Sequence, residues 1–157
     1  MRKIILILFF SIINLANLYC EDKRPVFGIG LCVGEPTGVS FKLWLTKENA
    51  FGSVVAWRGS DKTYFHCDYL THNYKAIRKG ELTGEIPRYW GIGIKILSEN
   101  DTSKRKTSYG LRIPLGINYI FAEMPIDFYG ELVPTIMFYP DTIGMIDASL
   151  GVRYYLE

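Results

Sequence analysis

The residues of this chain that could do chemistry are few, and they lie in short stretches that alternate between polar and apolar side chains. His66 and Asp68 occupy alternate positions of the stretch HCDY, so both would share one face of a strand and could form an acid–base pair. Ser40 and Ser53 are the candidate nucleophiles, but no spacing places either within reach of His66. We therefore interpret His66 and Asp68 as parts of an interior polar network, and we expect no catalytic site and no enzyme activity.

Cofactor and metal sites are not indicated either. The stretch GIGLCVG at Gly28–Gly34 has glycine spacing, but no helical pattern follows it and its glycines share one strand face, unlike a nucleotide-binding turn. The two histidines and three cysteines have no metal-ligand spacing. Cys32 and Cys67 are expected on opposite faces of their strands, and this predicts two free thiols.

The N-terminus has the pattern of an export signal. Arg2 and Lys3 precede an apolar run from Ile4 to Ile13, which is too short to span a bilayer as a helix. We interpret residues 1–20 as a signal peptide and residues 21–157 as one mature domain. An uncleaved anchor, another cleavage position and lipidation of Cys20 stay open.

The rest of the chain alternates with the period of β-strands. It has 11 Tyr, 9 Phe and 3 Trp, and no long helical pattern, which is typical of strands and turns. Its net charge of +2 gives no reason to expect a nucleic-acid partner. Pro114 and Pro134 are expected at bulges or bends. About eight segments result, at roughly 26–34, 38–45, 50–58, 62–72, 88–97, 108–121, 126–139 and 144–157, and the third has no clear inward face.

This pattern predicts an all-β fold, an eight-stranded antiparallel up-and-down transmembrane β-barrel, because closure leaves no open edge. The polar face of the strands is rich in glycine and nearly balanced in charge, as a packed interior requires. The apolar face would then contact lipid. The predicted interior ion network is Lys42, Asp68, Lys95, Arg112, Glu131, Asp147 and Arg153, and the predicted interfacial aromatic residues are Trp44, Trp57, Tyr89, Trp90, Tyr119, Phe121, Tyr139 and Tyr154.

Several stretches together resemble the small outer-membrane β-barrel family of spirochaetes. They are GIGLCVGEPTGVSFKLWL, HCDYLTHNY, YWGIGIKI, GLRIPLGINYIF, YGELVPTIMFYP and DASLGVRYYL. The resemblance implies an OmpX- or OmpA-like barrel in the outer membrane, in contact with its lipid. Some members of that family bind host serum or matrix proteins through surface loops.

The most charged stretch, SENDTSKRKT, is expected to be a solvated loop and the best candidate for an exposed binding surface. Its Lys104, Arg105 and Lys106 could bind acidic partners such as glycosaminoglycans. We thus expect a monomeric structural or adhesive outer-membrane barrel with a filled interior. A soluble lipocalin-like barrel that binds a small apolar ligand is the first alternative, and a lipid-modifying barrel enzyme is the second.

Overall fold

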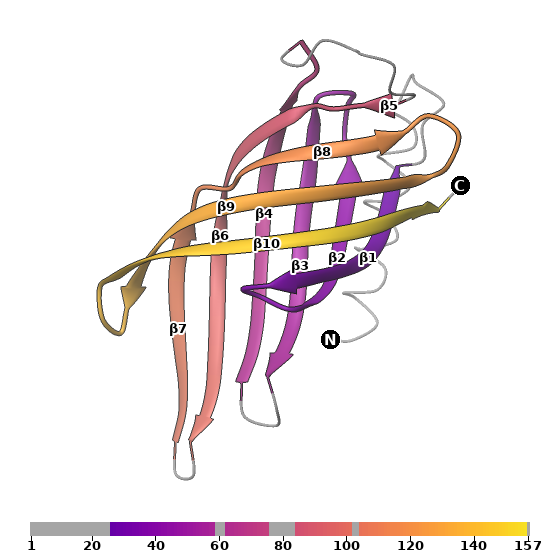
Figure 1. The fold of residues 1–157 in the computed structure, drawn as a ribbon. Helices are drawn as coiled ribbons and strands as arrows, with labels where there is room; N and C mark the ends of the chain where they lie inside the picture. Colours follow the sequence, from indigo (N-terminus) through magenta and orange to yellow (C-terminus); the bar gives the residue numbers. More distant parts are fainter. Residues whose placement is uncertain (1–25, 59–61, 76–83, 102–103, 157) are drawn as a thin grey trace.

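The computed structural model describes residues 26–58, 62–75, 84–101 and 104–156, and these ranges form one antiparallel β-sheet. Figure 1 shows that the front strands cross the rear strands steeply, as tilted strands of a closed barrel do. The strands are β1 (Phe27–Gly34), β2 (Gly38–Trp44), β3 (Asn49–Arg58), β4 (Lys62–Asn73), β5 (Gly84–Glu85), β6 (Arg88–Asp101), β7 (Lys104–Arg112), β8 (Leu115–Phe121), β9 (Ile126–Tyr139) and β10 (Ile143–Leu156).

The sheet closes on itself because β10 pairs with both β9 and β1. Two of the ring's strands are interrupted. β5 and β6 pair in one continuous register with β8, and β7 and β8 both lie between β6 and β9. Counting each interrupted pair as one strand gives a ring of 8 strands, which confirms the predicted up-and-down barrel.

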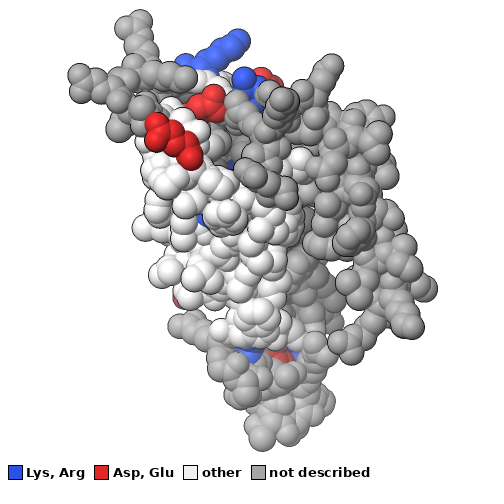
Figure 2. Space-filling view, turned by 90° about the vertical axis from the view of Figure 1, so that its right-hand side faces the viewer, with Lys and Arg blue, Asp and Glu red and all other residues white. Residues whose placement is uncertain are grey.

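The inside and the outside of the barrel have reversed polarity compared with a water-soluble barrel. Charged and polar side chains are buried inside, whereas aliphatic side chains such as Ile94, Leu132 and Ile146 are 52%, 59% and 76% exposed on the outside. On the face seen in Figure 2, the exposed charges of the described residues gather mainly towards the ends of the barrel. No helix in the described ranges is long and apolar enough to cross a membrane.

The structure fixes the inward face of β3, which the sequence left undetermined. Ala50, Val54 and Ala56 are buried, while Phe51 and Trp57 are exposed. The small inward side chains of β3 lie against larger rings from other strands: Val54 and Ala56 share a cluster with Tyr64 and Tyr129, and Ala50 shares one with Trp44 and Tyr155.

The two cysteines lie on opposite faces of the wall, as predicted. Cys32 is buried in the interior, and its thiol donates to the carbonyl oxygen of Pro36 at 2.9 Å. Cys67 is on the outward face of β4 and is half-buried. Both thiols are free.

The prediction for the prolines is only partly right. Pro114 does interrupt the strand, since it lies between β7 and β8. Pro134 is in register with Ile146 within the uninterrupted β9, and the register shift lies between Tyr109 and Gly110 instead. The carbonyl oxygen of Pro134 accepts from the amide of Ile113, so the side of Pro134 that lacks a donor faces the break beside Pro114.

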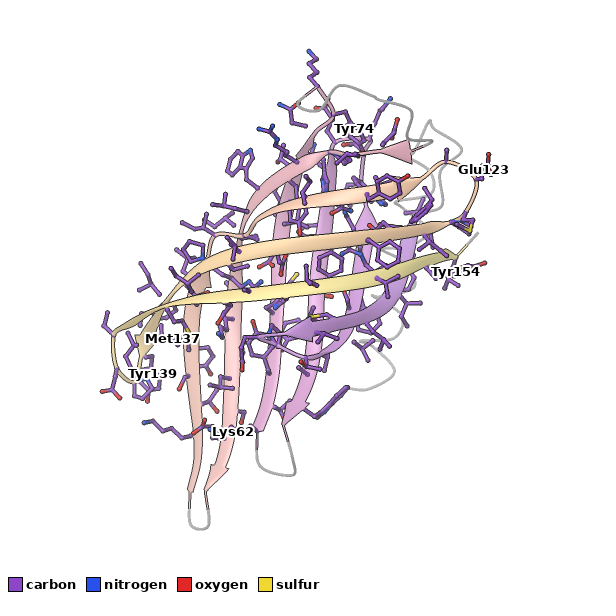
Figure 3. All side chains as sticks on the ribbon, in the orientation of Figure 1. Lys62, Tyr74, Glu123, Met137, Tyr139 and Tyr154 are labelled. Atoms are coloured by element: carbon purple, nitrogen blue, oxygen red, sulfur yellow. The ribbon has the colours of Figure 1, made fainter. Side chains whose placement is uncertain are left out.

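Aromatic side chains form outward bands near both ends of the barrel. Figure 3 shows Tyr139 and Tyr154 at opposite ends, and these side chains are 57% and 51% exposed. The predicted interfacial set is wrong for Trp44 and Tyr89, which are 8% and 4% exposed and point inward because they share the parity of the polar face. The other predicted members lie on the outward parity: Trp57, Trp90, Tyr119, Phe121, Tyr139 and Tyr154.

The stretch SENDTSKRKT is not the loop that its composition predicts. β6 continues to Asp101 and β7 begins at Lys104, so most of this segment is a two-stranded ribbon that extends past its neighbours (Figure 1). The register pairs Glu99 with Lys106 and Asp101 with Lys104, and such cross-strand pairing of opposite charges favours a hairpin.

Candidate functional site

The seven residues predicted to form the interior ion network all point into the barrel. Six of them are at most 6% exposed, and the side chain of Glu131 is 8% exposed. They come from six strands: Lys42 on β2, Asp68 on β4, Lys95 on β6, Arg112 on β7, Glu131 on β9, and Asp147 and Arg153 on β10.

Asp127 is not part of the predicted network, yet it is the acid with the most polar contacts among the described interior residues. Asp127 is 0% exposed and lies on β9, on the same strand face as Glu131. With it, the interior residues that the structure describes include four cations, Lys42, Lys95, Arg112 and Arg153, and four acids, Asp68, Asp127, Glu131 and Asp147. The alternation along β9 was the signal that could have identified it.

One cluster surrounds Asp127 near the end of the barrel that carries the C-terminus. Arg153 meets its carboxylate through two bonds, Nε to Oδ1 at 2.9 Å and Nη2 to Oδ2 at 3.1 Å. The Tyr155 hydroxyl and the Asn118 amide each donate to Oδ2 at 2.7 Å. The ammonium of Lys42 lies 3.9 Å from the same oxygen. This carboxylate is therefore satisfied as a buried charge must be.

Lys42 is held in a cage of rings beside this cluster. Its ammonium lies 4.1 Å from the ring centroid of Trp44 and 5.6 Å from that of Tyr89. It also donates to Nε2 of His72 at 2.9 Å, which leaves the hydrogen of that imidazole on Nδ1, where it faces the carbonyl oxygen of Glu48 at 3.0 Å. Cation–π contacts and a neutral histidine thus replace the water that a lysine normally has.

A second cluster surrounds Arg112 in the middle of the barrel. Its Nε lies 2.9 Å from Oδ1 of Asp68, and its Nη2 lies 3.4 Å from Oε1 of Glu131. Glu131 also accepts from the Tyr89 hydroxyl at 3.0 Å and from the Ser149 hydroxyl at 3.1 Å. One guanidinium is therefore shared by two carboxylates from different sides of the lumen.

A third pair closes the interior towards the opposite end. The ammonium of Lys95 lies 2.7 Å from Oδ2 of Asp147, and the Thr135 hydroxyl donates to the same oxygen at 3.2 Å. The ammonium also lies 5.0 Å from the ring centroid of Tyr64. The three clusters together occupy successive levels of the lumen.

Glycines on the inner face make room for the rings of this interior. A Cβ atom at Gly151 would collide with the ring of Tyr129, and a Cβ atom at Gly116 would collide with the ring of Tyr89. The Tyr129 ring in turn lies 4.0 Å from the guanidinium of Arg153. Glycine therefore occupies these positions because an eight-stranded barrel is only wide enough to be filled by side chains.

The acid–base pair considered in the sequence does not form a catalytic arrangement with either serine. Nε2 of His66 lies 3.5 Å from Oδ2 of Asp68, and Nδ1 lies 3.1 Å from the hydroxyl of Tyr64. Ser40 is buried and accepts from the Tyr129 hydroxyl at 3.0 Å. Ser53 is on the outward face of β3, across the wall from His66.

The network around Tyr64 assigns the hydrogen positions of His66. Arg112 donates to the Tyr64 hydroxyl, so this hydroxyl donates its own hydrogen to Nδ1 of His66. The imidazole hydrogen is then on Nε2, facing Asp68. In the described ranges, His, Cys, Asp and Glu side chains form no group of three that could hold a metal ion.

The predicted surface residues lie at the end of the barrel opposite the C-terminus. Lys104 and Arg105 are in β7, and their side chains lie outside the described part of the structure. Lys106 is 59% exposed in its side chain and lies 3.8 Å from Asp141, which follows β9. Lys62 of β4 pairs with Glu99 of β6 nearby. Lys106 and Lys62, whose side chains the structure describes, therefore each have an acidic partner at this rim.

Comparison with known proteins agrees with the architecture. The crystal structure of the N-terminal β-barrel domain of Pseudomonas aeruginosa OprF superposes with a TM-score of 0.56 at 15% sequence identity, and the match covers 85% of this chain and 98% of that domain. No family model matches the sequence, and no curated protein matches it. The chain therefore has the fold of a small closed antiparallel β-barrel whose lumen is filled by paired charges.

Proposed function

We propose that this protein is a small, monomeric outer-membrane β-barrel with a structural role and without enzymatic activity. One observation carries the proposal: in its described ranges, the barrel buries four cations and four acids while it exposes a wall of aliphatic and aromatic side chains. Exposure of this wall to water would cost much free energy, whereas the hydrocarbon of a bilayer is as apolar as the wall. The charges inside need no solvent because each has a partner.

The same polarity argues against the soluble alternative. A barrel that carries a small apolar ligand needs an apolar interior, but here the lumen is lined by residues such as Lys42, Arg112 and Asp127, which are all 0% exposed. The enzyme alternative has no supporting geometry in the described residues, because His66 and Asp68 are enclosed by Tyr64 and Arg112.

The likeness to an OprF barrel domain supports placement in an outer membrane. The proposed signal peptide, residues 1–20, lies outside the described residues and would supply the export route. Membership in the spirochaete family, and with it the binding of host serum or matrix proteins, is the finer part of the proposal and is supported by the sequence motifs.

The experiment that tests the structural proposal is refolding of residues 21–157 into detergent micelles and lipid vesicles. We expect partition into the detergent phase and faster gel migration of the unboiled protein than of the boiled protein. Planar bilayers should show no sustained open-channel current because the lumen is filled. Partition into water would contradict the membrane assignment, and a stable current would contradict the filled interior.

The adhesive part is tested on whole cells. A triple variant that combines Lys104→Ala, Arg105→Ala and Lys106→Ala removes the basic charge of the β6–β7 ribbon. We expect reduced binding of heparin-coated beads. Lys47→Ala, in the connection between β2 and β3 at the other end, is the matched control. Equal binding by the wild type and the triple variant would remove this role.

A further inference from the structure

The rim of the barrel has a step beside β10. β1 ends at Gly34, whose partner on β10 is Ser149, and β2 begins at Gly38. β10 is paired with β9 from Tyr154 as far as Ile143. Among the described residues, the segment Ile143–Asp147 therefore extends past the β1–β2 turn with a sheet neighbour on one side, as Figure 1 shows at the left of the barrel.

The backbone of this segment presents hydrogen-bonding groups on its open side. The carbonyl oxygen of Ala148 points to the β1 side, where it accepts from the amide of Glu35 at 2.9 Å. The backbone amide of Tyr155 points to the β9 side instead, because it donates to the carbonyl oxygen of Pro125 at 2.7 Å. Since the backbone N–H and C=O groups of successive residues point to alternate sides of a strand, those of Gly144 and Ile146 also point to the β1 side. Within the described ranges, no backbone group bonds to them there.

An edge of this kind is costly in either environment. Hydrocarbon cannot satisfy free N–H and C=O groups, and in water an unprotected apolar edge pairs with other chains. β1 has 8 residues, slightly fewer than the roughly 9–11 tilted residues that span a bilayer. The hydrocarbon should therefore end near the β1–β2 turn, which places Ile143–Ala148 at or beyond the membrane surface.

The outward side chains of the segment are apolar and exposed. Ile146 is 76% exposed, and Ile143 is 54% exposed. Nothing lies within 4 Å of the position that a Cβ atom would take at Gly144, so the outward face of the segment is uncovered there as well. The two charged groups nearest in sequence are engaged elsewhere: Asp147 pairs with Lys95 inside, and Asp141 pairs with Lys106 on the β7 side. The edge thus favours an uncharged, apolar partner.

We propose that Ile143–Asp147 of β10 is a strand-addition site for an extended, apolar peptide segment of another protein. The added strand would lie in line with β1, above the β1–β2 turn, and would bond to the backbone of Gly144 and Ile146. It would place an apolar side chain against Ile146. This inference deepens the proposed surface role and rests on it for the identity of the exposed end, but it uses β10 rather than the basic residues of β7.

The test uses the refolded protein in detergent and a fluorescent heptapeptide of alternating valine and threonine. The matched probe is the same peptide with alternate amides N-methylated, which keeps the side chains and removes the hydrogen bonds on one edge. We expect saturable binding of the first peptide and about tenfold weaker binding of the second, equivalent to about 1.4 kcal/mol. Equal binding of both peptides, or no saturable binding, would overturn the proposal.

Variants locate the site. Ile146→Pro removes the amide hydrogen on the open side while leaving the bonds to β9, and prolines are tolerated on such edges. We expect it to weaken binding about tenfold, and Ile146→Ala, which keeps the amide, to weaken it about threefold. Unchanged binding by Ile146→Pro would overturn the proposal. Unboiled gel migration shows separately whether each protein forms the barrel.

Hydrogen exchange on the wild-type protein decides the matter if Ile146→Pro does not fold. The amides of Gly144 and Ile146 should exchange fast without peptide and slowly with it, while those of Met145 and Asp147, which face β9, stay slow throughout. No slowing at Gly144 and Ile146 would overturn the proposal. Loss of heat-modifiable migration by the wild type would instead contradict the barrel itself.

Discussion

Arg153 and Asp127 are direct register partners on β10 and β9, and their side chains form a two-bond ion pair inside the barrel, with N–O distances of 2.9 Å and 3.1 Å. Cross-strand position and side-chain geometry therefore select the same partner. The carboxylate accepts further bonds from Tyr155 and Asn118, so this pair ties β8, β9 and β10 together near the barrel's closure.

The first prediction concerns Asp127. Asp127→Ala would leave Arg153 and Lys42 without their carboxylate, at a cost of about 3–5 kcal/mol in the free energy of unfolding. Urea titration of the protein in lipid vesicles measures this. Asp141→Ala is the control, because its side chain is 73% exposed and its pair with Lys106 lies at the surface. If both variants unfold at the same urea concentration as the wild type, Asp127 is not a buried charge.

The second prediction concerns the sharing of Arg112. Arg112→Met would leave Asp68 and Glu131 close together and uncompensated, which we expect to destabilise the barrel by about 3–5 kcal/mol. Adding Asp68→Asn and Glu131→Gln should restore most of that loss, because neutral side chains need no counter-charge. The same urea titration applies. A triple variant less stable than Arg112→Met would show that the three residues do not act as one unit.

The third prediction separates two glycines. A Cβ atom at Gly30 would collide with the backbone of Val152 and Arg153 on the neighbouring strand, which cannot move without breaking the pairing of β1 and β10. Gly30→Ala should therefore cost about 1–3 kcal/mol. Gly144→Ala has open space and should be neutral or stabilising by up to about 1 kcal/mol. Equal unfolding free energies for the two variants would argue against the close approach at Gly30.

The fourth prediction tests the outer wall. Ile94 lies in the middle of β6 and is 52% exposed, so Ile94→Arg would place a charge in hydrocarbon at a cost of about 2–4 kcal/mol. Ile143→Arg, at the end of β10, should cost about 0–1 kcal/mol because the membrane surface is near. Both are measured in vesicles. A fully stable Ile94→Arg protein would mean that this wall does not face lipid.

The alternation in the sequence was enough to predict the barrel and the direction of most side chains. It worked where one parity was clearly polar, as on β10, where Asp147 and Arg153 point inward between exposed Ile146 and Tyr154. It could not assign β3, because Ala50, Val54 and Ala56 are apolar although they face the lumen. These inward positions contact aromatic rings and not charged groups, so the polarity of the residues did not indicate which face of β3 points inward.

The sequence pattern also could not predict which charged residues pair across strands, for a different reason. Register decides which charges meet, and register is set by closure of the ring as well as by local pattern. Residue type favours interfacial positions for Trp44 and Tyr89, yet the rings of both lie beside the ammonium of Lys42 inside the barrel. The composition of the charged stretch near Lys106 predicts a loop, because composition does not reveal that acidic and basic positions are register partners on two paired strands.

The inner face of the barrel is tightly packed, whereas the outer face accepts many apolar residues, and this difference affects how homology between such barrels can be detected. Any branched aliphatic residue serves at positions like Ile94 or Leu132, so these positions can drift freely while the fold persists. Kinship between distant sequences would then survive chiefly at every second position, in the glycines, tyrosines and ionised groups of the lumen. An alignment scored on that half of the chain alone should recover ancestry that whole-length identity conceals.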